Sequence, residues 1–178
     1  MKIEFINLKR EYIENKEKFD NMFSQIASNS KFIGGEEINK LENNLSEYIG
    51  VKYGIGVSSG TDALLVPMMA WDFKAGSEII TTPFTFIATA EVISLLKLKP
   101  VFVDIENETY NIDVNKIEDK INKNTKAIIP VHIFGQSADM DDILNLSKKH
   151  NLIILEDTCQ SLGAKYKNKF TGSFGHAS

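Results

Sequence analysis

Apolar side chains recur at helical intervals in two long segments near the start of the chain. Residues 11–26 and 36–49 carry apolar positions three and four residues apart, with charged and polar residues between them. This spacing collects the apolar side chains on one face of a helix. Both segments are therefore predicted to be amphipathic helices. Gly50 follows the second segment, at the position where glycine commonly ends a helix.

From residue 53 onwards, short apolar runs alternate with segments of helical spacing. The predicted strands are 53–57, 79–80, 101–103, 127–131 and 152–155. The predicted helices between them are 61–69, 87–96, 114–121 and 140–150. Strands that alternate with helices favour a mostly parallel sheet flanked by helices, which is an α/β fold. No internal repeat or linker interrupts the pattern, so we expect one domain.

The C-terminal part of the chain departs from this alternation. Residues 165–178 are typical of turns and strands, and no closing helix follows them. Two interpretations are open at this point. Either a larger protein has been cut, or this piece needs a partner to complete its sheet.

Composition restricts the class of protein. Apolar residues make up 43% and charged residues 25% of the 178 positions, as in ordinary soluble domains. The net charge of −4 argues against a nucleic-acid partner. A single cysteine, Cys159, excludes internal disulfides and cysteine-rich metal sites. The start, Met1 to Phe5, lacks the apolar core of a signal peptide, and no apolar run is long enough to span a membrane. We expect a cytoplasmic protein without a membrane partner.

Two carboxylates, Glu156 and Asp157, directly follow the most apolar predicted strand. In open α/β sheets ligands bind outside the carboxyl ends of the strands, so Asp157 occupies a functional position. A buried carboxylate there needs a cationic partner. A metal ion, an arginine and the protonated ring nitrogen of pyridoxal phosphate (PLP) are the candidates. The alternative is that Glu156 or Asp157 only caps the next segment.

The sequence GVSSGTDA, residues 56–63, joins a predicted strand to a helix start. Backbone N–H groups at a helix N-terminus bind anions, and Gly60 allows a phosphate to approach closely. Thr61 could add a hydroxyl donor. The alternative is a capping box between Ser59 and Asp62. A nucleotide-binding P-loop is excluded because no GxxxxGK[ST] motif occurs, although residues 152–157 resemble a Walker B strand.

Aromatic residues follow another strand end, in the sequence TTPFTF at residues 81–86. Either Phe84 or Phe86 could stack on a flat ring at the same edge of the sheet. The simpler interpretation is that both belong to the core.

Other candidate groups carry weaker signals. The histidines His132, His150 and His176 lack metal-ligand spacing, so no metal site is expected. His132 lies at a strand end and could line the cleft, but a structural role is favoured. Lysines alternate with other residues at 165, 167 and 169, which is typical of the solvent-exposed face of a hairpin and not of a Schiff-base residue.

Taken together, these parts have the chemistry needed to hold PLP. A helix start would neutralise the phosphate, an aromatic ring would cover one face of the pyridine, and Asp157 would keep the ring nitrogen protonated. A protonated ring withdraws electrons from the α-carbon of the substrate and so makes proton removal there feasible.

Several segments in order resemble the DegT/DnrJ/EryC1/StrS family of sugar aminotransferases, which have the fold-type I architecture. The matching segments are FINL (5–8), FIGG (32–35), VSSGTDAL (57–64), TFIATA (85–90), PVFVD (100–104), KAIIPVH (126–132) and EDTCQSLGA (156–164). The resemblance implies roles for particular residues. Gly60, Thr61 and Asp62 would bind the cofactor phosphate, with Asp62 acting through its backbone. Phe86 would stack on the pyridine ring, Asp157 would pair with its nitrogen, and Gln160 would contact its phenolic oxygen.

The same resemblance implies a function and an expected departure from the family. Relatives transfer an amino group from glutamate to a nucleotide-linked keto-sugar, as homodimers that share the active site. Their Schiff-base lysine lies in a segment resembling CFSFxxxK, which would begin just after Ser178. We therefore expect residues 1–178 to be an incomplete, truncated PLP-binding large domain, inactive alone and lacking the small C-terminal domain. The alternatives are a PLP-dependent sugar dehydratase, which has histidine at the lysine position, and a non-catalytic binding module.

Overall fold

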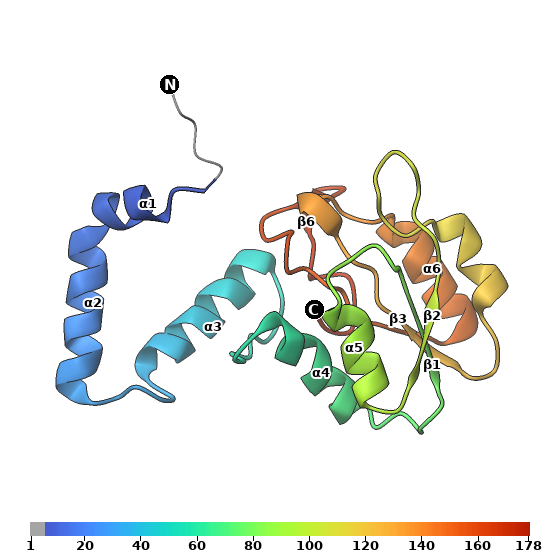
Figure 1. Cartoon of the computed structure of the whole chain (residues 1–178), viewed down its shortest axis with the longest axis horizontal. Helices are drawn as coiled ribbons and strands as arrows, with labels where there is room; N and C mark the ends of the chain where they lie inside the picture. Colours follow the sequence, from blue (N-terminus) through green and yellow to red (C-terminus); the bar gives the residue numbers. More distant parts are fainter. Residues whose placement is uncertain (1–5) are drawn as a thin grey trace.

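The computed structural model describes residues 6–178, and the start of the chain that was compared with a signal peptide lies outside them. Three helices come first: α1 (Leu8–Glu14), α2 (Lys16–Asn29) and α3 (Glu36–Ile49). A region of alternating helices and strands follows (Figure 1). Its elements are α4 (Gly60–Ala70), β1 (Glu78–Thr81), α5 (Ala88–Leu95), β2 (Lys99–Phe102), β3 (Thr125–Ile128), α6 (Met140–His150) and β4 (Ile153–Ile154).

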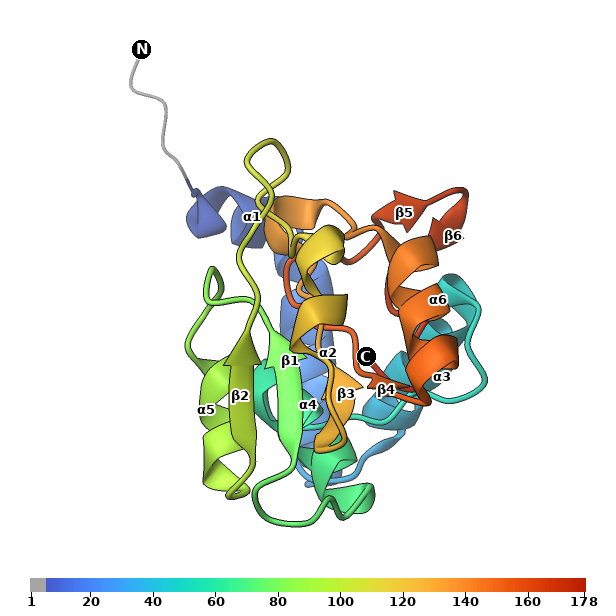
Figure 2. The ribbon, with the colours of Figure 1, turned by 90° about the vertical axis from the view of Figure 1, so that its right-hand side faces the viewer.

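The four strands form one parallel sheet in the order β2-β1-β3-β4, visible in Figure 2. Isolated parallel bridges extend it, from Val131 to Asp157 and from Leu155 to Ala177. A separate antiparallel hairpin pairs β5 (Lys165–Tyr166) with β6 (Lys169–Phe170). The predicted parallel α/β architecture is confirmed, and so is the hairpin.

Each face of the sheet is covered by its own apolar cluster. Ile79, Ala127 and Ile129 pack with residues of α4 and α5 on one face. Ile80 and Ile128 pack on the other face with residues of α6 and of the segment before β3. Because neighbouring residues of a strand point to opposite faces, the uninterrupted apolar runs of β1 and β3 supply both clusters.

The predicted strand at 53–57 is wrong. Gly54 lies so close to α3 that a Cβ atom would stand 2.5 Å from the carbonyl oxygen of Glu42. The N–H of Gly56 donates to Glu42 Oε1 at 2.6 Å. The two glycines therefore bind this segment to a helix, and within the described residues it makes no strand pairing.

Two predicted helices differ in detail from the observed elements. The segment 11–26 is divided at Asn15, whose side-chain amide donates to the carbonyl oxygen of Glu11. The segment 114–121 forms two short 3₁₀ turns, η1 (Val114–Lys116) and η2 (Glu118–Lys120). Asp113 caps the first turn by accepting the N–H of Asn115.

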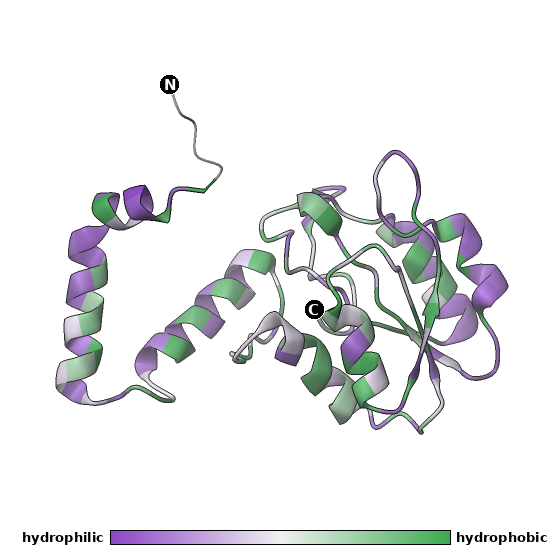
Figure 3. Ribbon diagram, viewed as in Figure 1, coloured by the Kyte–Doolittle hydropathy of each residue, from purple (hydrophilic) through white to green (hydrophobic). Residues whose placement is uncertain are grey.

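Helices α1 and α2 extend away from the sheet (Figure 1). In this part of the described chain no residue of either helix is buried. Their apolar positions, visible as green bands in Figure 3, include Phe19 at 49% and Phe23 at 72% exposure. The predicted amphipathic pattern is present, and Tyr12 of α1 packs against Phe19 of α2 with ring centroids 6.0 Å apart, but this contact buries neither residue.

Candidate active site

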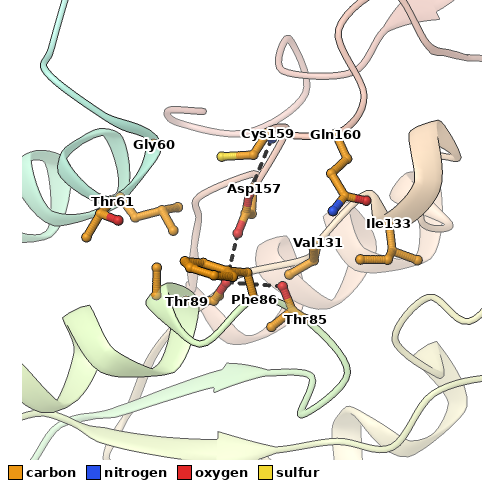
Figure 4. Close-up of a pocket in the computed structure, with 12 residues that line it drawn as sticks. Gly60, Thr61, Thr85, Phe86, Thr89, Val131, Ile133, Asp157, Cys159 and Gln160 are labelled. Carbon is orange, nitrogen blue, oxygen red and sulfur yellow. Dashed lines mark hydrogen bonds between the residues drawn. The ribbon is translucent and has the colours of Figure 1, made fainter. Parts of the chain in front are cut away.

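A cavity of about 270 Å³ opens at the carboxyl ends of the strands (Figure 4). In the sheet, β2 lies on one side of β1, and β3 and β4 lie on its other side. The direction in which strands are added therefore reverses between β1 and β3. Open α/β sheets bind ligands at such a switch point. Five of the six predicted site residues line the cavity, and these are Gly60, Thr61, Phe86, Asp157 and Gln160.

Asp157 lies on the floor of the cavity and is only 6% exposed. Its backbone pairs with the end of β3, because its N–H donates to Pro130 and its carbonyl accepts from His132. The Thr89 hydroxyl donates to Oδ2 at 2.8 Å, and the Cys159 N–H donates to Oδ1 at 3.3 Å. Each carboxylate oxygen can accept a second hydrogen bond. The carboxylate therefore retains acceptor capacity toward the cavity.

Thr89 is a site residue that the sequence analysis did not identify. It lies in the first turn of α5, is 1% exposed, and lines the cavity beside Phe86. Thr85 precedes it by four residues, and the two hydroxyl oxygens are 3.4 Å apart. In the sequence, the only indication of this role is a pair of threonines four residues apart near a helix start. Threonine is too common at such positions for this pair to indicate a binding site.

Replacement of Thr89 by valine is expected to weaken cofactor binding about tenfold. Valine has a similar shape but lacks the hydroxyl that donates to Asp157, and a hydrogen bond to a charged group contributes about 1.5–3 kcal/mol. Titration of the complete protein with PLP, followed by absorbance, would measure the loss. Thr89→Ser, which keeps the hydroxyl, is the control and should bind within twofold of the parent. Equal weakening by both variants would contradict this role.

The N-terminus of α4 forms one wall of the cavity. Gly60 and Thr61 line it, and the first N–H groups of a helix have no intrahelical acceptor. Ser59 is the N-cap, since its hydroxyl oxygen accepts the N–H of Asp62 at 3.1 Å. The N-cap at Ser59 is thus confirmed, but the Asp62 carboxylate accepts from the hydroxyls of Ser58 and Ser59 and not, as in a capping box, from the Ser59 N–H. Gly60 and Thr61 are left facing the cavity. Asp62 is not among the lining residues, and its predicted contact with a phosphate stays a prediction.

Gly60 is favoured by close packing and not by its backbone angles, because a larger residue would force the Cys159 side chain to move. A Cβ atom at this position would stand 2.6 Å from Cys159 Sγ. Burial, together with the charge of the neighbouring Asp157 carboxylate and a hydrogen bond to it, raises the pKa of the Cys159 thiol to about 11. The thiol is therefore protonated at neutral pH, and a role as nucleophile is disfavoured.

Gln160 is held with its amide in a defined orientation. Its Oε1 accepts the N–H of Phe134 at 3.0 Å. The amide nitrogen consequently points toward the cavity, as Figure 4 shows, where it can donate to a ligand oxygen. Phe134 has φ 55°, a left-handed conformation that is uncommon for a bulky residue, and this hydrogen bond helps to hold it.

The two candidate phenylalanines have different surroundings, and neither is a core residue. Phe86 lines the cavity and is 72% exposed. Phe84 packs against Tyr110 and Phe134, with ring centroids 5.7 and 6.1 Å away. Phe86 is thus the ring available to a ligand in the cavity.

The remaining candidate groups lie outside the cavity. His132 is completely buried and contacts Glu156, so its role is structural. The lysines at 165, 167 and 169 are exposed on the β5–β6 hairpin, as predicted. No cluster of three or more potential metal ligands, and no helix able to cross a membrane, occurs within residues 6–178.

The fold is that of the fold-type I aminotransferases, because solved aminotransferases of this class match it with TM-scores of 0.91 and 0.93, at 34% and 30% identity over 98% and 96% of this chain and 49% and 46% of their own. Residues 13–178 match the DegT/DnrJ/EryC1/StrS aminotransferase family, and the chain belongs to this family. The resemblance inferred from the sequence motifs is confirmed.

Among curated relatives, the UDP-2-acetamido-2-deoxy-3-oxo-D-glucuronate aminotransferase of Pseudomonas aeruginosa is 44% identical over 167 residues. The match covers 94% of this chain and 46% of the relative. The chain thus spans about half the length of the curated relatives it matches.

Two solved structures bear on the cofactor. NtdA from Bacillus subtilis, with bound cofactor PMP, has a TM-score of 0.86 and 31% identity, covering 96% of this chain and 40% of its own. A GDP-4-keto-6-deoxymannose-3-dehydratase with a trapped PLP-glutamate geminal diamine has a TM-score of 0.81 and 32% identity, covering 85% and 41%. These structures support the predicted cofactor.

Proposed function

We propose that this chain is the cofactor-binding part of a PLP-dependent aminotransferase that transfers the amino group of glutamate to a nucleotide-linked keto-sugar. The observation that carries the proposal is the convergence of Gly60, Thr61, Phe86, Asp157 and Gln160 on one cavity. These residues come from three separate segments of the sequence. Family membership and the cofactors of the structural neighbours support the proposal.

The residues of the cavity fit PLP by their chemistry. The start of α4 offers N–H donors to a phosphate, and Phe86 offers an exposed ring face. Asp157 offers a nearly buried carboxylate, which is suited to a cationic ring nitrogen, and the amide nitrogen of Gln160 can donate to the phenolic oxygen. When bound, the cofactor would supply an electron sink for the α-carbon of the amino donor.

The residues of this chain would bind and orient. Asp157 would hold the proton on the ring nitrogen, and Thr89 would fix the carboxylate by donating to Oδ2. Ser59 would keep the α4 N-terminus in place by capping it. Fixed orientation of the cofactor and protonation of its ring are two of the contributions that a protein makes to PLP chemistry.

The volume of the cavity supports a complete active site to which this chain contributes only one part. At about 270 Å³ it lies just below the usual range of about 300–1000 Å³ for small-molecule sites. It would accommodate the cofactor, and the nucleotide-linked sugar would need additional surface. We propose that this surface comes from a further domain and from the second subunit of a homodimer, in the cytoplasm, with the Schiff-base lysine following residue 178.

A dehydratase is the second candidate function. It is favoured by the similarity to the GDP-4-keto-6-deoxymannose-3-dehydratase. An aminotransferase remains the first proposal because the 44% identical relative is an aminotransferase for a 3-oxo sugar nucleotide.

A two-step reaction with the complete protein tests the proposal. Addition of glutamate should convert the bound cofactor to its amine form, with loss of the absorbance of the aldehyde form. A nucleotide-linked 3-keto-sugar should then restore that absorbance and yield an amino-sugar, detected by mass spectrometry. The matching nucleotide-sugar with a hydroxyl in place of the ketone is the control and should have no effect. Restoration by free keto-acids alone would contradict the sugar substrate, and loss of water without nitrogen transfer would identify a dehydratase.

A further inference from the structure

Glu156 is a completely buried carboxylate next to Asp157, and the proposed reaction does not use it. Since successive residues of a strand point to opposite faces, Glu156 points away from the cavity that Asp157 lines. Its two oxygens accept four hydrogen bonds. Phe174 and Gly175 donate their N–H groups to Oε1 at 2.8 and 2.7 Å, and Gly172 donates to Oε2 at 2.8 Å.

The fourth donor is His132, whose Nε2 lies 2.9 Å from Glu156 Oε2. The other ring nitrogen, Nδ1, accepts the N–H of Ala138 at 3.1 Å, so the proton of a neutral imidazole must be on Nε2. Burial alone would raise the pKa of Glu156, but the hydrogen bonds from His132 and the backbone N–H groups outweigh it and lower the pKa. Glu156 is therefore an ionised carboxylate.

These four partners belong to the two segments that flank the end of β4. On one side, the Asp157 N–H donates to Pro130, and the His132 N–H donates to the carbonyl oxygen of Asp157. On the other side, the Glu156 N–H donates to Ala177. The side chain of Glu156 thus joins the same two segments whose backbones fix residues 156 and 157.

We propose that Glu156 and His132 are positioning residues, which hold the Asp157 carboxylate in the cavity by binding its two flanking segments together. The importance of the Asp157 carboxylate for catalysis rests on the proposed function. Its placement by Glu156 and His132 does not depend on that function. All four partners are donors, so only a carboxylate satisfies them. An amide at this position would present its NH₂ group to two N–H donors in either orientation.

The first measurement is amide hydrogen exchange in the complete protein with Glu156→Gln. Each lost hydrogen bond to the charged group contributes about 1.5–3 kcal/mol, so the amides that face the new NH₂ group should exchange at least about tenfold faster. These are Phe174 and Gly175 in one orientation of the glutamine amide, and Gly172 in the other. Exchange in β1 and β3 should be unchanged. Glu118→Gln is the matched control, because Glu118 also accepts from a histidine, His150, but on the surface. It should leave all of these rates unchanged.

The second measurement reports on Asp157 without any cofactor. The Cys159 thiol has a raised pKa partly because the Asp157 carboxylate is adjacent. Displacement of Asp157 in Glu156→Gln should lower the pH midpoint of Cys159 alkylation. Greater access to the thiol would lower it too, because burial also raises this pKa. The shift is therefore measured again in an Asp157→Asn background, where a shift caused by displacement of the Asp157 charge should disappear and one caused by access should remain. A fall of one pH unit in the midpoint corresponds to about tenfold more thiolate at neutral pH.

The outcomes separate the possibilities. Unchanged exchange at residues 172–175, or faster exchange with an unchanged Cys159 midpoint, would overturn the proposal.

If Glu156→Gln fails to fold, His132→Phe provides a milder test. It removes one of the four donors, and the exchange of Gly172, which shares Oε2, should increase more than that of Phe174. Equal exchange at both amides would overturn the proposal in that case. Neither measurement needs PLP, so its result is independent of the proposed reaction.

Discussion

Replacement of Asp157 by alanine in the complete protein should reduce kcat at least about 100-fold while the fold is retained. If this carboxylate keeps the cofactor ring nitrogen protonated, its loss removes the charge that stabilises the transition state, and such losses typically cost about 100-fold or more. The structural cost is smaller, because the partners of the Asp157 carboxylate among the described residues are neutral donors, the Thr89 hydroxyl and the N–H and thiol of Cys159. Steady-state kinetics and thermal unfolding would measure the two effects separately.

Asp142→Ala is the matched control, since Asp142 is an exposed carboxylate in the first turn of α6. Its turnover should equal that of the parent. A third variant, Asp157→Asn, keeps the shape and removes the charge, and it should resemble Asp157→Ala in kcat. Turnover of Asp157→Ala within a few-fold of the parent would exclude the proposed pairing with the ring nitrogen.

Treatment of the 178-residue chain with PLP and borohydride should trap only scattered, substoichiometric adducts. None of the described residues that line the cavity is a lysine. The hairpin lysines have other partners, because Lys165 lies over the ring of Phe170, Lys169 over that of Phe174, and Lys167 pairs with Asp141. Without a lysine held against the aldehyde, the reaction has no advantage from proximity.

Peptide mapping by mass spectrometry would locate the adducts. The matched control is a variant with arginine at positions 165, 167 and 169, and its total labelling should fall only in proportion to the lysines removed. A single stoichiometric adduct on one hairpin lysine would show that the Schiff-base residue lies inside this chain. The alignment of the sequence with the family would then be wrong.

Much of the fold could be predicted from the sequence because β1 and most of β3 are buried. The apolar runs at β1, β3 and β4 are typical of strands inside an α/β sheet, and α3 and α6 begin and end where predicted. The segment 53–57 was mispredicted because its hydrogen bonding is decided by α3, and Glu42 is eleven residues or more away in sequence. The local pattern of apolar and polar residues gives no information on contacts between segments that are distant in sequence.

The candidate site could be predicted to a similar extent. Asp157, Gly60 and Thr61 follow from the positions of strand ends and helix starts, which local sequence reveals. Thr89 and the role of Glu156 could not be predicted, since both depend on contacts between distant segments. Thr89 reaches Asp157 across 68 positions of sequence, and Glu156 reaches His132 across 24.

The exposed helices α1 and α2 affect how this chain tolerates mutation. Since none of their described residues is buried, substitutions there remove little packing, and surface substitutions usually change stability by less than about 0.5 kcal/mol. Phe19 or Phe23 could be exchanged for a polar residue with almost no effect on the folding of the sheet. A library selected only for folding would therefore accumulate changes in these helices and few in β1 or β3. An alignment of the selected variants would therefore show the positions of the sheet as constant and those of these two helices as variable.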